Sequence, residues 1–136
     1  MKNFFIDSKE NIWVRKMAKK YGVPVQALKR ILKRDKLCVY CHKGMILPRK
    51  GTKQLNWVTI EHMSDKVSGN NPKTISICCG SCNSSRRMGF NKWFKTQYCL
   101  DRGINEKNVA KPVKAYMRMI MRLSPEKRKK FVLQNY

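Results

Sequence analysis

Acidic side chains and histidines are scarce in this chain. Of its 136 residues only 8 are Asp or Glu and 2 are His, whereas 31 are Lys or Arg, which gives a formal net charge of +23. A chain this basic repels itself unless it meets a polyanion, and nucleic acid is the usual polyanionic partner. An anionic membrane surface is the competing interpretation of the charge. The composition therefore predicts a protein that binds nucleic acid.

Long apolar runs are also missing. No stretch reaches the length needed to cross a bilayer, and the opening MKNFFIDSKE lacks the apolar core of a secretion signal. We therefore expect no membrane association and a location inside the cell, in the cytoplasm or nucleoid, where thiols stay reduced. Hydrophobic residues still make up 42% of the chain, enough for one compact core with helical extensions.

The six cysteines are clustered rather than scattered. The segments CVYC and CCGSC each contain a C-x-x-C pair, and a few dozen residues separate them. Two such pairs are typical of a structural zinc site, because each pair presents two thiolates to one tetrahedral ion. In a reducing compartment we expect zinc rather than disulfides. The predicted ligands are Cys38, Cys41, Cys79 and Cys82.

Three further side chains bear on this zinc prediction. Cys78 is an alternative to Cys79, although only Cys79 keeps the two-residue spacing to Cys82. His42 directly follows the first pair and could replace one thiolate. Cys99 lies in an apolar, helix-like run and is expected in the core.

The residues before the first cysteine pair are typical of two helices. ENIWVRKMAKKYG closes on Gly22, and PVQALKRILKRDK opens at Pro24. Residues 1–37 therefore form a predicted helical unit with a helix-turn-helix pattern, whose second helix would enter a DNA major groove. Packing of both helices on the zinc core is the alternative. The side chains available for a groove contact are Gln26, Lys29, Arg30, Lys33 and Arg34.

The middle and the end of the chain predict an α+β fold with a small ββα core between flanking helices. LNWVTIEH (55–62) alternates and is rich in β-branched residues, and TISIC (74–78) follows a turn-forming loop, so the two predict antiparallel strands. A helix is expected from Cys82 or Asn83 to Leu100, with an interruption near Gly89. Residues 91–136 are predicted to be a helical extension, with helices over 113–123 and after Ser124-Pro125.

One carboxylate and one imidazole stand side by side in TIEHM, at the end of the first predicted strand. Asn83 directly follows the predicted zinc ligand Cys82. Carboxylate and carboxamide oxygens suit Mg²⁺ or Mn²⁺, and an imidazole suits a general base. Adjacent strand residues point to opposite faces, so Glu61 and His62 can share a site only where the strand ends or bulges. Asp65 is the alternative metal ligand.

The order CVYC, TIEHM, CGSCN over residues 38–90 resembles the zinc-stapled members of the HNH, or ββα-metal, endonuclease family, and is similar to its endonuclease VII branch. This resemblance implies cleavage of DNA to 5′-phosphate and 3′-hydroxyl ends. It implies that His62 is the general base and that Glu61 and Asn83 hold one Mg²⁺ or Mn²⁺ ion. Arg86, and more weakly Arg87, would contact a phosphate.

The sequence departs from the family pattern at two positions. Glu61 stands where Asp is commoner, and Thr74 stands where the family has a bracing asparagine, a role that Asn70 or Asn71 could fill. Two other functions therefore remain open. The first is a zinc-ribbon protein that binds DNA or RNA without cutting it. The second is a homodimeric, junction-resolving nuclease. A short, basic nuclease suits a phage or a mobile element.

Overall fold

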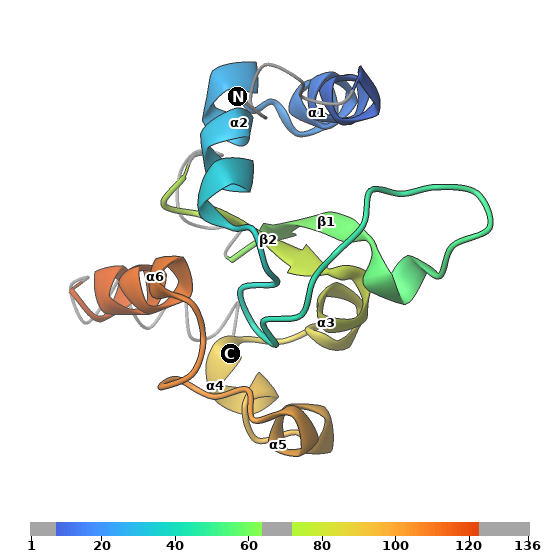
Figure 1. Cartoon of the computed structure of the whole chain (residues 1–136). Helices are drawn as coiled ribbons and strands as arrows, with labels where there is room; N and C mark the ends of the chain where they lie inside the picture. The colour runs from blue at the N-terminus through green and yellow to red at the C-terminus, as the bar shows by residue number, and fades with distance from the viewer. Residues whose placement is uncertain (1–7, 64–71, 123–136) are drawn as a thin grey trace.

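The computed structural model describes residues 8–63 and 72–122, and an antiparallel pair of strands lies at its centre (Figure 1). Strand β1 spans Val58–His62 and strand β2 spans Ile75–Cys79. Val58 pairs with Cys79 at one end of the hairpin, and His62 pairs with Ile75 at the other. Helices surround this sheet, so the predicted mixed class of helices and a small antiparallel sheet is confirmed.

The first strand is shorter than predicted because its first residues form the 3-10 turn η2, Gln54–Asn56. This turn lies directly against the start of the helix after β2, where a Cβ on Gly80 would overlap the Gln54 carbonyl oxygen. Glycine is therefore required at position 80 for the close backbone approach. The Gly80 amide also donates to the Trp57 carbonyl at 3.0 Å, which fixes η2 beside the sheet.

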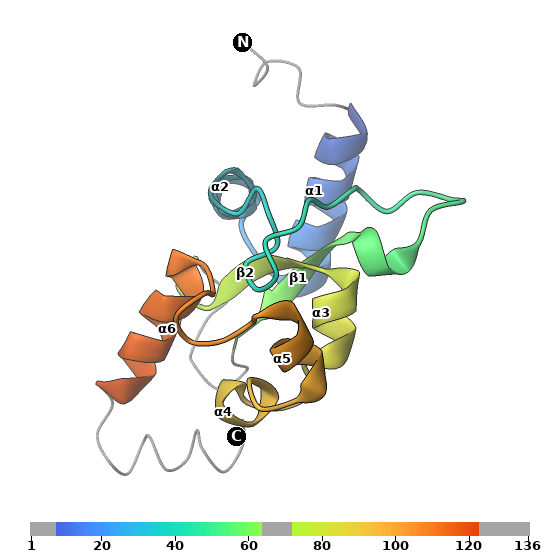
Figure 2. The same cartoon turned by 60° about the horizontal axis from the view of Figure 1, so that its bottom comes forward.

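Two N-terminal helices cover one face of the sheet. Helix α1 spans Ser8–Tyr21 and helix α2 spans Val25–Arg34, and the two cross steeply (Figures 1 and 2). Their apolar sides pack on the sheet as one buried cluster, as expected for amphipathic helices. The cluster includes Val14, Ala18, Leu28 and Ile31 from the helices and Ile60, Ile75 and Ile77 from the strands.

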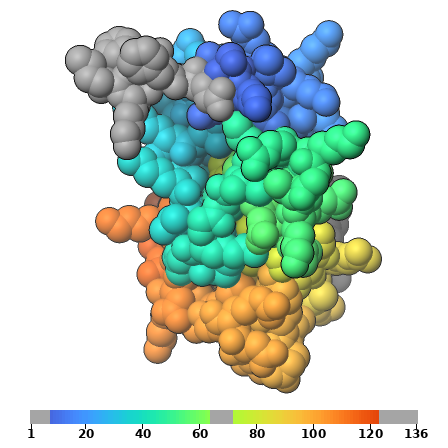
Figure 3. All heavy atoms as spheres, turned by 45° about the vertical axis from the view of Figure 1, so that its right-hand side comes forward, coloured from blue at the N-terminus to red at the C-terminus, as the bar shows by residue number. Residues whose placement is uncertain are grey.

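The other face carries four shorter or C-terminal helices, and the C-terminal ones form the opposite end of the molecule from α1 (Figure 3). These are α3 (Gly80–Ser85), α4 (Phe90–Trp93), α5 (Gln97–Arg102) and α6 (Lys111–Met121). They enclose a second buried cluster that contains Phe90, Trp93, Cys99 and Tyr116. Cys99 is fully buried there, in agreement with the core position expected for it.

The helix predicted from Cys82 or Asn83 to Leu100 does have its interruption near Gly89, but it begins earlier, at Gly80, and a second break before Gln97 divides the region into three short helices. Helix α3 begins at Gly80, since Cys79 caps it by accepting the Cys82 amide on its sulfur. Gly89 precedes α4 in extended conformation, and the Thr96 hydroxyl caps α5 by accepting the Cys99 amide. Each cap starts a new helix and redirects the chain around the core. The helix expected after Ser124-Pro125 lies outside the described residues.

Strand β2 is hydrogen-bonded along both edges. One edge pairs with β1. On the other edge, Asp35 Oδ2 accepts the Ile77 amide at 3.0 Å, and the Val39 amide donates to the Ile77 carbonyl at 3.2 Å. The segment after α2 therefore seals an edge that would otherwise be open to pairing. Within the described part of the chain, no helix is both long and apolar enough to cross a membrane.

Candidate metal centre and active site

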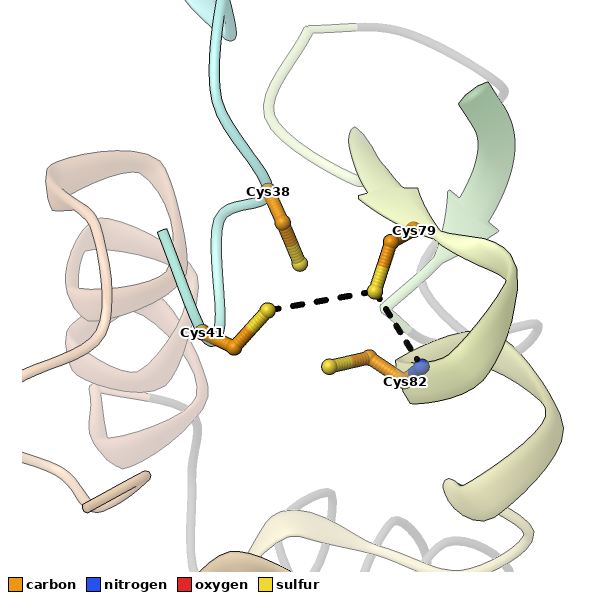
Figure 4. Close-up of side chains that lie close together, drawn as sticks. All are labelled: Cys38, Cys41, Cys79 and Cys82. Carbon is orange, nitrogen blue, oxygen red and sulfur yellow. Dashed lines mark hydrogen bonds between the residues drawn. The ribbon is translucent and has the colours of Figure 1, made fainter. Parts of the chain in front are cut away.

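Four cysteines that are distant in sequence meet at the Val58–Cys79 end of the hairpin (Figure 4). One pair lies on the loop after α2, and the other lies at the junction of β2 and α3. The backbone folds tightly around each pair: the Cys38 amide donates to the Lys43 carbonyl at 3.0 Å, and the Cys82 amide donates to Cys79 Sγ at 3.4 Å. The sulfur atoms of Cys38, Cys41, Cys79 and Cys82 all lie within 4.8 Å of one another.

The spacing of these sulfur atoms fits a tetrahedral metal ion. With a Zn–S bond of about 2.3 Å, a tetrahedron of four thiolates has edges of about 3.8 Å. Cys41 Sγ and Cys79 Sγ are separated by 3.8 Å. All four cysteines are free thiols. The cluster could therefore hold a metal such as zinc, with no position left for water.

Protons are shared within the metal-free cluster. Hydrogen bonds from Cys79 and Cys82 lower the pKa of the Cys38 thiol far below its usual range. The hydrogen bond of Cys79 to Cys38 raises the pKa of Cys79 to about 11, and the bonds of Cys82 to Cys38 and Cys79 raise the pKa of Cys82. Cys79 and Cys82 therefore hold their protons more strongly than Cys38 does. A bound dication would displace them, which is how thiol clusters couple metal binding to proton release.

The other candidate ligands lie outside this cluster. Cys78 is turned to the opposite face of β2 from its neighbour Cys79, and its Sγ lies 3.5 Å from Thr59 Oγ1. Burial raises the pKa of the Cys78 thiol. His42 is exposed in the left-handed conformation (φ 64°), and its Nε2 contacts the Asn108 carbonyl instead of the thiols. The second cysteine pair thus contributes Cys79 and not Cys78 to the cluster, and His42 does not replace one of the thiols.

Glu61 lies at the far end of β1, buried on the face that α3 covers. Only 5% of the residue is exposed. Its Oε2 accepts hydrogen bonds from the Tyr40 hydroxyl and from Arg86 Nη1, the latter at 2.9 Å. Burial raises the pKa of Glu61 above its usual 4.5, although the Arg86 charge opposes this. Both partners bind the same oxygen, so Oε1 is bonded to neither of them.

Asn83 lies in α3 and is tied to the strand that carries Glu61. Its Nδ2 donates to Thr59 Oγ1 at 2.9 Å and to the Ile60 carbonyl at 3.1 Å. These bonds use both hydrogens of the carboxamide nitrogen and fix the orientation of the group. They also leave Oδ1 as the atom that could bind a cation. Among the described residues, the hydrogen bonds of Glu61 and Asn83 therefore use Glu61 Oε2 and Asn83 Nδ2, and the other oxygen of each group is the candidate metal ligand.

His62 lies on the opposite face of the hairpin from Glu61. The strand register continues unbroken to the His62–Ile75 pair, so the bulge that would bring both side chains to one face is not present in β1. The imidazole packs against the ring of Tyr21 from α1, with the ring centroids 5.1 Å apart. The strand does end at His62, so Glu61 and His62 flank the same strand terminus from its two sides.

The predicted DNA-contacting residues fall into two groups. Arg86 is internal: its side chain is 8% exposed, pairs with Glu61 and donates to the carbonyls of His62 and Met63. Arg87 is exposed beside it. On α2, Lys29 is half-buried, whereas the side chains that the structure leaves exposed are Gln26, Arg30 and Lys33. Arg34 instead makes an ion pair with Asp35, 2.7 Å from Nε to Oδ1.

Four alternative site residues from the sequence remain to be placed, together with Tyr40, which the sequence did not indicate. Asp65, Asn70 and Asn71 lie outside the described residues. Thr74 is buried, and its carbonyl accepts the Met63 amide at 3.0 Å. Sequence reasoning missed Tyr40, the residue within CVYC whose hydroxyl reaches Glu61. The only signal for it was an aromatic residue inside a cysteine pair.

Comparison with known proteins identifies no relative of this chain: no family model, no curated protein and no solved structure matches it.

Proposed function

We propose that the protein is an HNH-type endonuclease that cleaves DNA with a divalent metal ion and is stabilised by structural zinc. Zinc would be held by Cys38, Cys41, Cys79 and Cys82, whose spacing fits four thiolates around one ion. The catalytic ion would be Mg²⁺ or Mn²⁺, bound through Glu61 Oε1 and Asn83 Oδ1. Both ions favour oxygen ligands and keep coordination positions for water and phosphate.

The observation that carries this proposal is the attachment of Asn83 to β1. Asn83 directly follows Cys82, so the cysteine cluster fixes the start of α3. The carboxamide then bonds Ile60, the residue before Glu61, at 3.1 Å. Asn83 is thus attached to β1 at the two residues that precede Glu61. Glu61 on β1 and Asn83 on α3 would therefore present their oxygen ligands from elements that are fixed to each other, as a preorganised metal site requires.

The chain's own residues supply three roles in the proposed reaction. His62 takes a proton from water, whose oxygen then attacks the phosphorus as the bond to the 3′ oxygen breaks. Glu61 and Asn83 would hold the divalent ion, and the chemistry that it would supply is stabilisation of negative charge on the phosphate and the departing oxygen. The departing 3′ oxygen takes a proton from solvent, which leaves a 3′-hydroxyl and a 5′-phosphate. The high positive charge of the chain attracts the DNA.

A plasmid assay tests this function. Purified protein is incubated with supercoiled DNA and Mg²⁺ or Mn²⁺, with EDTA as the metal-free control. We expect nicked or linear product from the wild type, and a loss of about 10²–10⁴-fold in rate for His62→Ala. The second histidine supplies a matched control, His42→Asn, because asparagine tolerates the left-handed backbone of position 42. Undiminished cleavage by His62→Ala would exclude His62 as the base.

A non-catalytic DNA- or RNA-binding protein is the second candidate function. It is favoured by the internal ion pair of Glu61 with Arg86, because a buried and paired carboxylate also has a purely structural use. This candidate predicts salt-sensitive plasmid binding without cleavage under any metal. The same assay therefore separates the two functions. Preference for a four-way junction over linear duplex would identify the junction-resolving form.

A further inference from the structure

Tyr21, the last residue of α1, packs its ring against the imidazole of His62. The ring centroids are 5.1 Å apart, and the ring planes are tilted by 56°. Aromatic rings at this separation attract each other in a specific geometry. This contact brings a side chain of the N-terminal helix pair, otherwise a candidate DNA-binding unit, to the residue proposed as the general base.

The backbone around Tyr21 holds its ring in place. Gly22 ends α1 in the left-handed conformation (φ 65°), and the Val23 amide donates to the Ala18 carbonyl at 2.9 Å. This is a typical glycine-terminated helix end. Ala18 and Val23 are both buried, so α1 cannot unwind without exposing apolar surface. Lys20 Nζ lies 5.3 Å from the Tyr21 ring centroid, a cation–π contact with the same ring.

The helix pair is also bonded to the strand opposite His62. At the end of α2, Arg34 Nη2 donates to the Ile75 carbonyl at 2.9 Å, and Ile75 is the register partner of His62. Two residues further along β2, the Ile77 amide donates to Asp35 Oδ2 at 3.0 Å. The helices and this end of the hairpin are therefore joined both by apolar packing and by hydrogen bonds. Tyr21 and His62 therefore lie on elements that are fixed to one another.

A general base must keep one ring nitrogen directed at the attacking water. The second side-chain torsion of histidine is broad, so an unsupported imidazole samples several orientations. We propose that Tyr21 is a positioning residue that holds the His62 ring in its reactive orientation, which makes the N-terminal helix pair part of the active site. This inference rests on the proposed endonuclease function and assigns a new residue to it.

The contact itself is tested by NMR, independently of activity. The chain has only two histidines, so the carbon-bound ring protons of His62 and His42 are readily assigned. A neighbouring aromatic ring displaces the resonances of such protons. We expect Tyr21→Leu to move the His62 signals and leave those of His42 unchanged, whereas Tyr21→Phe keeps the wild-type positions. Trp13→Leu is the matched control, because Trp13 packs in the same cluster on the same helix.

Kinetics then test the positioning role. Tyr21→Leu should lower kcat by about tenfold with little change in KM, whereas Tyr21→Phe should cleave at nearly the wild-type rate. Thermal melting verifies that both variants are folded. Unchanged His62 signals in Tyr21→Leu, or a moved signal with an unchanged kcat, would overturn the inference. A wild-type protein that binds DNA but never cleaves it would instead overturn the proposed function, and with it any catalytic meaning of the contact.

Discussion

The two ends of the β1–β2 hairpin differ in the completeness of their sites. At the Val58–Cys79 end, the sulfur atoms of four cysteines all lie within 4.8 Å of one another. At the His62–Ile75 end, the Glu61 carboxylate is held through Oε2 alone by its partners among the described residues, Tyr40 and Arg86. A closed metal shell suits a structural role, and an open one suits chemistry. The proposed structural zinc site and the proposed catalytic site thus lie at opposite ends of the same pair of strands.

Removal of the metal at the closed end should have the largest effect. Structural zinc contributes about 10–16 kcal/mol in small zinc peptides, as much as the whole stability of a typical domain. We expect Cys82→Ser to bind no zinc and to lose its cooperative thermal transition. Metal analysis and melting curves measure both properties. Cys78→Ala is the control, since it removes a buried thiol outside the cluster, and a loss of zinc from this variant alone would contradict the ligand set.

Breaking the buried ion pair at the open end should have the next largest effect. Arg86→Met leaves the Glu61 carboxylate buried without its cation, at a cost of about 3–5 kcal/mol in the free energy of unfolding. The double variant Glu61→Leu/Arg86→Met should recover most of that loss, because no isolated charge remains. Urea denaturation measures each value. The exposed neighbour in Arg87→Met should change stability by less than about 0.5 kcal/mol. Equal effects of the two arginine substitutions would argue against a buried pair.

The pH dependence of stability provides the finest test of the open end. Burial raises the pKa of Glu61 above 4.5, so the folded protein keeps this proton to a higher pH than the unfolded chain does. Stability therefore falls as the pH rises from 4.5 through the raised pKa, and is constant above it. Glu61→Gln should remove this decline, as seen in urea midpoints measured across the range. Glu106→Gln, which changes an exposed carboxylate, should retain it. A wild-type curve that matches Glu61→Gln would exclude the effect.

The closed end was largely predictable from the sequence because its geometry is local. A C-x-x-C pair orients two thiolates by itself, and β-branched alternation located both strands. The start of α3 was misjudged because Cys79 acts as both a cluster member and the helix cap. A sequence pattern that places Cys79 in a metal site does not also show that its sulfur caps the following helix.

The open end was less predictable because it depends on tertiary packing. The sequence indicates Glu61 and His62 as candidate site residues, but nothing in TIEHM indicates that Arg86 turns inward to reach Glu61 at 2.9 Å. The contact of Tyr21 with His62 joins residues from separate elements that no motif connects. Long-range side-chain partners follow from the shape of the core, and local sequence patterns carry little information about it.

The sealed outer edge of β2 has a consequence for the assembly of the protein in the cell. The segment that bonds Ile77 through Asp35 and Val39 also carries Cys38, so docking this segment completes both the sheet and the cysteine cluster. Binding of zinc by the proposed cluster would therefore also close the sheet. A chain without the metal would expose an unpaired strand edge, and the supply of metal would then decide between folding and aggregation.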